Sequence, residues 1–151
     1  MRNNILNISM LLLTCILTGS SVSYGQKAVT GAVIKFDYMV YDYGIMKEGD
    51  IKECSFTFKN IGDAPVIIQH VEEPCGCTVP SWSKEPVLPG KTGEIKVVYH
   101  SKDRPGVFRK TLAVKTNAVQ LNHEDILLMI KGNALTNKEW KQKNKTTLKS
   151  N

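Results

Sequence analysis

Residues able to perform covalent chemistry are scarce in this chain of 151 residues, which contains four cysteines and three histidines. Its Asp and Glu residues are scattered over predicted strand faces and turns, and the sequence gives no reason for two carboxylates to pair as a general acid and base. Ser81 and Ser83 lack the strand-turn-helix setting of a hydrolase nucleophile, and the Gly-x-x-x-x-Gly-Lys spacing of a phosphate-binding loop is missing. We therefore predict that the protein is not an enzyme and carries no cofactor.

Long apolar runs are also missing. The longest, Ile5–Leu17, is shorter than the ~20 residues that cross a bilayer. It follows a positive charge at Arg2 and precedes small residues up to Gly25, which is the pattern of a secretory signal peptide. We predict a signal peptide over residues 1–25, cleavage before Gln26, and no transmembrane span in the mature protein. The expected location is the periplasm or the cell envelope.

Cys15 offers an alternative way of reaching the envelope. If it is the lipidated cysteine of a lipoprotein signal, the mature protein is tethered to a membrane through it. The preceding residue, Thr14, is bulkier than the Gly, Ala or Ser typical of that position. This difference favours ordinary cleavage before Gln26 over lipidation.

The body of the chain shows a period of two where a helix would show 3.6. In Glu53–Lys59, the residues Cys54, Phe56 and Phe58 alternate with polar neighbours, which predicts a strand with one buried face. Six more extended runs are Lys35–Asp42, Ala64–Ile68, Thr78–Trp82, Glu94–His100, Phe108–Lys115 and Ile126–Ile130. Turn-forming Gly, Pro, Asn and Asp residues separate them. About seven short strands predict an all-β, antiparallel β-sandwich over residues 33–137.

The same alternation predicts pairing and packing. Glu53–Lys59 and Ala64–Ile68 are joined by a short turn-forming segment, so we expect them to form a hairpin. The inward positions of several runs should share one dry interior between the sheets. These predicted core residues are Phe56, Phe58, Ile95, Val97, Tyr99, Phe108, Leu112 and Val114.

Basic charge is concentrated outside the predicted domain. A short leader, residues 26–32, precedes the domain, and residues 138–151 follow it with five lysines against one glutamate. This tail has too few apolar residues to offset its ordering entropy, so we expect it to be disordered and solvated. The alternative is peripheral contact with an anionic envelope surface, with Trp140 as a shallow anchor. Nucleic-acid binding is not expected, because the basic residues are not interleaved with stacking aromatics on a folded face.

The remaining chemistry lies in Cys75-Gly76-Cys77-Thr78. In an exported protein, simple pairing of Cys54, Cys75 and Cys77 leaves one thiol over. The alternation points Cys54 into the core, where a free cysteine acts as a small apolar side chain. The other two can form a mutual disulfide, which Gly76 would permit through its backbone freedom and which would be easily reduced. Alternatively, one of them is structural and is bonded to Cys54 across the sheets.

A soft-metal site is the third interpretation of this motif. The thiolates of Cys75 and Cys77 would bind Cu(I) or Zn(II), and an imidazole from His70 or His100 would complete the site. Two thiolates at this spacing do not define a metal site by themselves. All three interpretations therefore stay open.

Four segments in order resemble the bacterial domain-of-unknown-function family numbered 1573. They are Asp42–Asp50, Phe56–Pro65, Cys75–Pro80 and Leu88–Ile95, and the similarity covers about residues 36–134. The resemblance implies an immunoglobulin-like antiparallel β-sandwich, related in architecture to Ig-like modules of sperm and cilium proteins and exported from envelope-bearing bacteria. Cys54 departs from the family, whose members more often look polar or have histidine there. A disulfide through Cys54 would therefore be peculiar to this chain.

Two functional hypotheses of different class follow. In the first, the protein is a non-enzymatic module that holds an envelope protein or surface through its loops or an exposed strand edge. In the second, it is a thiol-redox or soft-metal-binding protein that acts through Cys75 and Cys77. The positions of the loops and of Cys75 and Cys77 in the fold bear on both hypotheses.

Overall fold

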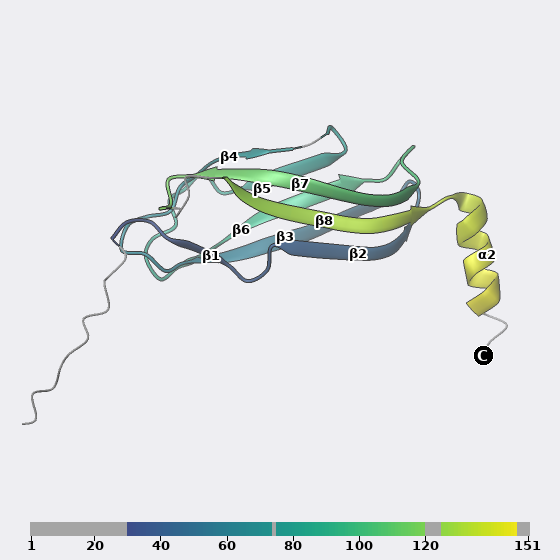
Figure 1. Cartoon of the computed structure of the whole chain (residues 1–151), viewed down its shortest axis with the longest axis horizontal. Helices are drawn as coiled ribbons and strands as arrows, with labels where there is room; N and C mark the ends of the chain where they lie inside the picture. Colours follow the sequence, from purple (N-terminus) through teal and green to yellow (C-terminus); the bar gives the residue numbers. More distant parts are fainter. Residues whose placement is uncertain (1–29, 74, 120–124, 148–151) are drawn as a thin grey trace, which may run out of the picture.

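The computed structural model describes residues 30–73, 75–119 and 125–147, which contain eight strands and one helix. Two sheets lie face to face, and the helix lies beyond one end of them (Figure 1). The elements are β1 (Ile34–Phe36), β2 (Val40–Lys47), β3 (Ile51–Asn60), β4 (Ile68–Glu72), β5 (Thr78–Trp82), β6 (Thr92–His100), β7 (Gly106–Thr116), β8 (Ile126–Leu135) and α2 (Asn137–Thr147). The predicted signal peptide, Cys15 and the end of the tail lie outside the described residues.

The predicted β-sandwich is confirmed. Its sheets have the strand orders β1-β3-β6-β5 and β2-β8-β7-β4. There are eight strands instead of about seven, because the predicted opening run is divided between β1 in one sheet and β2 in the other. β2 runs parallel to β8, whereas the other paired strands are antiparallel. A tight hairpin can join only antiparallel strands. β2 and β8 can run parallel because β3 to β7, which belong to both sheets, separate them in the chain.

The predicted hairpin between Glu53–Lys59 and Ala64–Ile68 is wrong. β3 pairs with β1 and β6, whereas β4 pairs with β7 in the opposite sheet. The segment between β3 and β4 crosses from one sheet to the other. Asn60 fixes this crossing, because its buried side-chain amide donates to the carbonyls of Ala64 and Val87, each at 2.8 Å. The residues that suggested a tight turn therefore begin a crossover.

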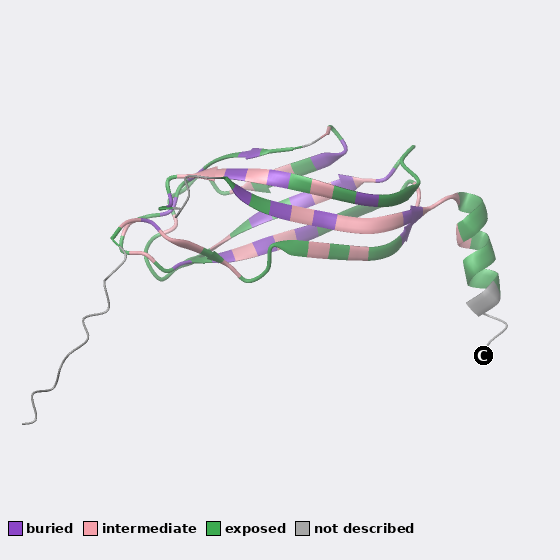
Figure 2. Cartoon of the chain, in the orientation of Figure 1, coloured by how far each residue is buried: buried purple, intermediate pink, exposed green. Residues whose placement is uncertain are grey.

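The predicted core is confirmed. All eight residues have exposed fractions of 7% or less: Phe56, Phe58, Ile95, Val97, Tyr99, Phe108, Leu112 and Val114. Tyr99 of β6 and Phe108 of β7 belong to opposite sheets, and their rings stack with 4.2 Å between centroids. Figure 2 shows buried and exposed residues alternating along the strands. The period of two thus identifies both the strands and their inward faces.

Two partly buried glycines lie beneath aromatic rings of the core. Gly93 pairs with Phe58 across β6 and β3, and Gly132 pairs with Phe108 across β8 and β7. A Cβ atom added at Gly93 would lie 2.5 Å from Cζ of Phe58, and one at Gly132 would lie 2.8 Å from Cζ of Phe108. Each ring therefore occupies the space that a side chain on its paired glycine would need.

The structure contains a helix where the sequence analysis expected a disordered tail. Asn137–Thr147 form α2, which begins with a capping box. Glu139 N donates to Thr136 Oγ1 at 3.3 Å, and Glu139 Oε2 accepts from Thr136 N at 2.8 Å. The Thr136 hydroxyl also donates to Glu139 Oε2 at 2.7 Å, and this bond together with the one from Thr136 N lowers the pKa of the Glu139 carboxyl, which keeps it charged at the positive end of the helix. A composition argument misses such a local signal.

None of the helices in the described ranges has the length and the apolar character needed to cross a bilayer.

We expect Gly93→Ala to destabilise the protein, because the added methyl group would overlap the Phe58 ring. Overpacking of this kind costs about 1–3 kcal/mol in the free energy of unfolding. Denaturant titration measures the change, and Gly76→Ala is the matched control because nothing lies within 4 Å of its added Cβ. Equal stability of the two variants would contradict the packing described for Phe58.

We expect Thr136→Ala to weaken α2, because it removes the side-chain acceptor of the capping box. The loss of an N-cap costs about 1 kcal/mol. The helical signal in far-ultraviolet circular dichroism should fall. Thr111→Ala, at an exposed position of β7, should leave that signal unchanged.

Candidate functional site

Cys75, Gly76 and Cys77 lie in the turn that leads from β4 of one sheet into β5 of the other. A disulfide joins Cys75 to Cys77, with 5.3 Å between their Cα atoms. Thr78 N donates to the carbonyl of Cys75 at 3.2 Å, and His100 N donates to the carbonyl of Cys77 at 2.8 Å. The end of β6 therefore holds the second cysteine in place.

The two sulfur-bearing residues differ in burial. Cys77 belongs to the core and has an exposed fraction of 1%, whereas Cys75 is partly buried at its margin. Gly76 between them is exposed, and its φ lies outside the left-handed region that favours glycine. The expectation that Gly76 provides unusual backbone freedom is therefore wrong. Apart from its two chain neighbours, nothing lies within 4 Å of a Cβ atom added at Gly76, so the space beside this residue is open.

Thr78 is the polar neighbour of the disulfide and is fully buried. Its Oγ1 lies 3.9 Å from Cys75 Sγ and 3.7 Å from Cys77 Sγ. Because disulfide sulfurs carry no proton, the hydroxyl is the donor, and its single proton is directed at one sulfur or shared between the two. Within the described part of the chain, these sulfurs are the hydroxyl's hydrogen-bonding contacts. Since sulfur is a weak acceptor, the disulfide compensates the burial of this hydroxyl poorly.

Cys54 is buried in β3 and unpaired. Burial raises the pKa of its thiol, and the charge of Glu53 adds to the effect, although a hydrogen bond with Tyr43 opposes both. Burial also raises the pKa of the Tyr43 hydroxyl, which donates to the carbonyl of Val97 at 3.2 Å. A neutral, buried thiol is a poor nucleophile. The alternative disulfide between Cys54 and the Cys75–Cys77 turn is not formed.

The two predicted imidazole ligands have other surroundings. His70 is exposed on β4, and its ring lies edge-on to Trp82 with 6.2 Å between centroids. His100 contacts the turn through its backbone N–H, which donates to the carbonyl of Cys77. In residues 30–73, 75–119 and 125–147, no three side chains of His, Cys, Asp or Glu gather as a group that could hold a metal. The structure thus joins Cys75 to Cys77 without assembling the four predicted ligands.

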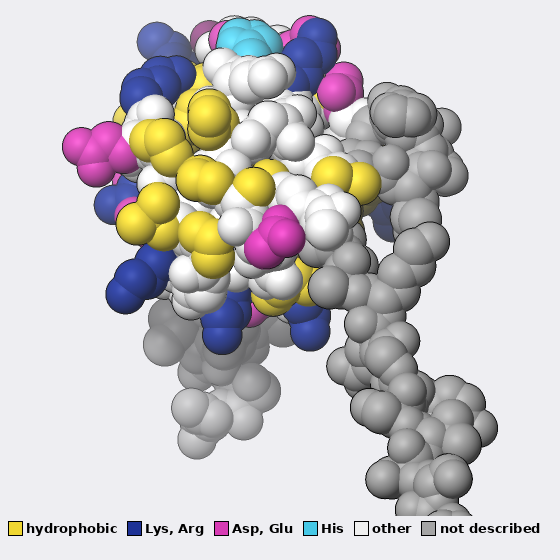
Figure 3. Space-filling view, turned by 90° about the vertical axis from the view of Figure 1, so that its left-hand side faces the viewer, with side chains coloured by type: hydrophobic (Ala, Val, Ile, Leu, Met, Phe, Trp, Pro, Cys, Tyr) yellow, Lys and Arg dark blue, Asp and Glu magenta, His cyan; other side chains and the backbone are white. Residues whose placement is uncertain are grey.

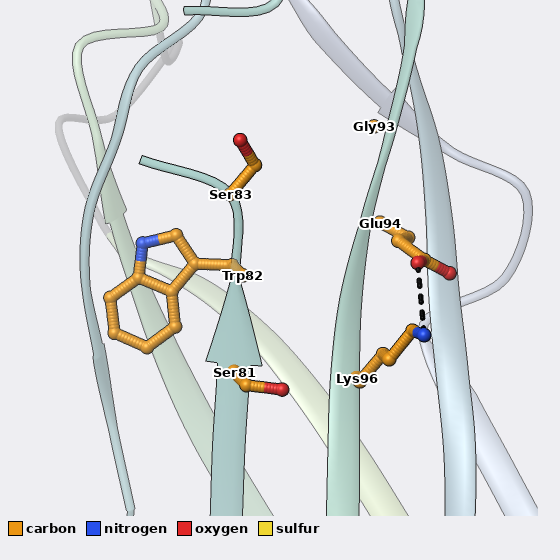
Figure 4. Close-up of a pocket in the computed structure, with 6 residues that line it drawn as sticks. All are labelled: Ser81, Trp82, Ser83, Gly93, Glu94 and Lys96. Atoms are coloured by element: carbon orange, nitrogen blue, oxygen red, sulfur yellow. Dashed lines mark ion pairs between the residues drawn. The ribbon is translucent and has the colours of Figure 1, made fainter. Parts of the chain in front are cut away.

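A hollow of about 330 Å³ lies beside β5 and β6. Its lining residues are Ser81, Trp82, Ser83, Gly93, Glu94 and Lys96. Figure 4 shows Glu94 and Lys96 paired on β6 at 3.4 Å, while the Trp82 indole points away from them. Ser83 Oγ accepts from Glu85 N at 3.1 Å. Among the residues that the structure describes, no general base is hydrogen-bonded to Ser81 or Ser83.

The loops at the end of the sandwich opposite the Cys75–Cys77 disulfide form an apolar surface that the sequence analysis did not predict. Figure 3 shows hydrophobic side chains gathered on this end, with Lys and Arg side chains around them and Asp and Glu side chains among and beside them. We name this the loop-end surface and define it by Ile61, Ile67, Leu88 and Val119, whose exposed fractions lie between 39% and 57%. Loop residues have no periodicity. The available signal was the presence of large apolar residues within turn-forming segments.

Hydrogen bonds hold these loops together. Asn117 Nδ2 donates to the carbonyl of Pro65 at 2.9 Å, and Asn117 Oδ1 accepts from Ile67 N at 2.7 Å. Val66 and Val87 exchange backbone hydrogen bonds at 2.9 and 2.8 Å. Three separate loops are thereby tied to one another. The loop-end surface is therefore ordered before any partner arrives.

A family model described as "Protein of unknown function (DUF1573)" matches residues 34–134. The chain belongs to the DUF1573 family. This confirms the resemblance found in the sequence and nearly the same span. Comparison with curated proteins gave no match.

Several solved structures share the fold of this DUF1573 chain. A protein of unknown function from Porphyromonas gingivalis W83 superposes with a TM-score of 0.60 at 12% identity, covering 72% of this chain and 50% of that one. The ASH / PapD-like domain 7 of human CEP192 gives 0.57 at 12% identity, with 77% and 96% covered. The VesB protease of Vibrio cholerae gives 0.51 at 14% identity, with 67% and 32% covered. At such identities the likeness shows only a PapD-like or Ig-like sandwich.

The chain spans half the length of the Porphyromonas protein and about a third of VesB. The CEP192 domain, in contrast, is covered almost completely. The DUF1573 chain is therefore comparable in extent to one PapD-like domain.

Reduction of the Cys75–Cys77 disulfide should change stability little, because the bond links residues only two positions apart. The chain-entropy model gives about 1–2 kcal/mol for so short a loop. Denaturant titrations with and without a phosphine reductant measure the difference. The double variant Cys75→Ser/Cys77→Ser is the control and should resemble the reduced protein. A loss of several kcal/mol would show that the bond is mainly a structural one.

Proposed function

We propose that the protein is a non-enzymatic, exported binding module that holds a partner protein of the cell envelope through the loop-end surface. The observation that carries this proposal is the group of exposed apolar residues on mutually bonded loops. The signal-like sequence of residues 1–25 supports export. Ig-like sandwiches commonly present their binding residues on loops supported by a rigid scaffold.

The apolar residues of the loop-end surface are grouped and held in place, and both properties favour binding. A single exposed apolar residue is ordinary on a protein surface, but a group of them marks an interaction site. Burial of such side chains stabilises a complex by roughly 25 cal/mol per Å² of apolar area. Because the bonds of Asn60 and Asn117 already fix the loops, little ordering entropy is lost on binding.

Charge at the rim indicates the chemistry of the partner. Lys59, Lys84 and Lys91 are exposed on the strands and loops of this end. Of the nearby acids, Asp63 accepts a hydrogen bond from Gly31 N, and Glu85 is exposed. Three exposed lysines against two acids leave this rim weakly positive, which fits a protein surface whose apolar anchor is flanked by acidic residues. Such complementarity favours specificity and rapid association.

We expect Ile61→Lys to weaken partner binding by about tenfold or more, because it places a charge in the apolar centre. Ile51→Lys is the matched control. Ile51 begins β3 at the other end of the sandwich, and its exposed fraction of 62% is close to the 55% of Ile61. Both variants should keep the denaturation midpoint of the wild type.

The measurement is cross-linking and co-purification of tagged protein from its native envelope, quantified by mass spectrometry. A partner that is captured by the wild type and by Ile51→Lys but lost with Ile61→Lys supports the proposal. Equal capture by all three proteins contradicts it. The dissociation constants of the purified partner with the three proteins then give the size of the effect.

A further inference from the structure

We propose that Cys75–Cys77 is a thiol–disulfide exchange site that oxidises dithiols of other proteins. This site lies away from the loop-end surface and does not rest on the proposed binding function. Three observations lead to it: unequal access to the two cysteines, a buried hydroxyl beside the sulfurs, and a bond between residues only two positions apart in the sequence.

Access determines which sulfur is attacked. Exchange is a displacement in which a thiolate approaches one sulfur and the other leaves. Cys75 is partly exposed and has open space beside Gly76, whereas Cys77 is buried. An incoming thiolate therefore attacks Sγ of Cys75, and Sγ of Cys77 is the leaving group.

Thr78 is placed to assist that departure. Its hydroxyl is 3.7 Å from Cys77 Sγ and can donate to it. A hydrogen bond to an anionic acceptor is about twice as strong as one to a neutral acceptor. The hydroxyl thus gains most when Cys77 becomes a thiolate, so it stabilises the transition state more than the intact disulfide. We describe Thr78 as a positioning residue of the site.

The surrounding backbone allows the bond to open without unfolding. β5 remains paired with β6 along Thr78–Trp82, and His100 N still donates to the carbonyl of Cys77. The closed loop is too short for the disulfide to be a major source of stability. Cys54 does not compete, because it is buried and burial raises the pKa of its thiol.

The reaction balances with a protein dithiol as reductant. A substrate thiolate bonds to Cys75 Sγ, the Cys75–Cys77 bond breaks, and Cys77 leaves as a thiolate that takes up one proton. The second substrate thiol, after losing its proton, attacks the substrate sulfur of the mixed disulfide and releases Cys75 as a thiolate, which takes up the second proton. Two electrons and two protons pass from the substrate to the Cys75–Cys77 pair. The substrate leaves with a disulfide.

The first test mixes the oxidised mature protein with an equal amount of a reduced synthetic Cys-x-x-Cys peptide, without oxygen. Mass spectrometry follows the peptide disulfide. We expect most of the peptide to be oxidised, with none above background for Cys75→Ser or Cys77→Ser and an unchanged yield for Cys54→Ala. A purely structural disulfide would leave the peptide reduced, which would overturn the proposal.

The second test addresses direction and the role of Thr78. In the reduced state, Cys77→Ser should react rapidly with an aromatic disulfide through Cys75, and Cys75→Ser should react slowly through buried Cys77. Thr78→Val should slow peptide oxidation by about tenfold, while Thr78→Ser restores it. Folding is checked by circular dichroism in each case. Equal rates for the two single-cysteine variants would overturn the order of attack, and wild-type rates for Thr78→Val would overturn the assignment of Thr78.

Discussion

Burial of the inward side chains of β6 holds both ends of the molecule in place. Ile95, Val97 and Tyr99 lie between the sheets without exposure, and β6 pairs with β3 on one side and β5 on the other. Just before the strand, Lys91 accepts a backbone hydrogen bond from Asn60, the residue that fixes the loop end. At its last residue, His100 donates to Cys77. A shift of β6 by one residue would turn the core row outward and displace both regions.

The parts of the fold that were predictable depend on local burial. Alternation along Glu53–Lys59 identifies a strand and its inward face, because each position is decided by its neighbours two residues away. Strand partners and directions depend on residues far apart in the chain, so the pattern could not separate a hairpin from the crossover after Asn60 or predict that β2 runs parallel to β8. The helix after Thr136 has a readable capping box, yet the scarcity of apolar residues favoured a disordered tail.

At Cys75–Cys77, too, the sequence identifies the reactive residues but not their arrangement. The sequence singles out two cysteines separated by one residue, but it leaves three interpretations that differ only in geometry. The inward register of Thr78 opposite Tyr99 and the unequal burial of the cysteines are consequences of β5 pairing with β6. The loop-end surface is harder to foresee, because its residues come together only when three loops meet at one end of the sandwich.

The rigidity of the sandwich also bears on how its two ends work together. Opening the disulfide frees a loop of very few residues, while the pairing of β5 with β6 and the buried row of β6 remain. The loops that carry Ile61 and Leu88 are held by the side chains of Asn60 and Asn117, whose hydrogen bonds go to Ala64, Val87, Ile67 and Pro65 within the described residues. Nothing in this arrangement gives two discrete packings that the redox state could shift, as coupling between distant sites would need. We therefore expect the proposed binding at one end and the proposed exchange at the other to be independent of each other.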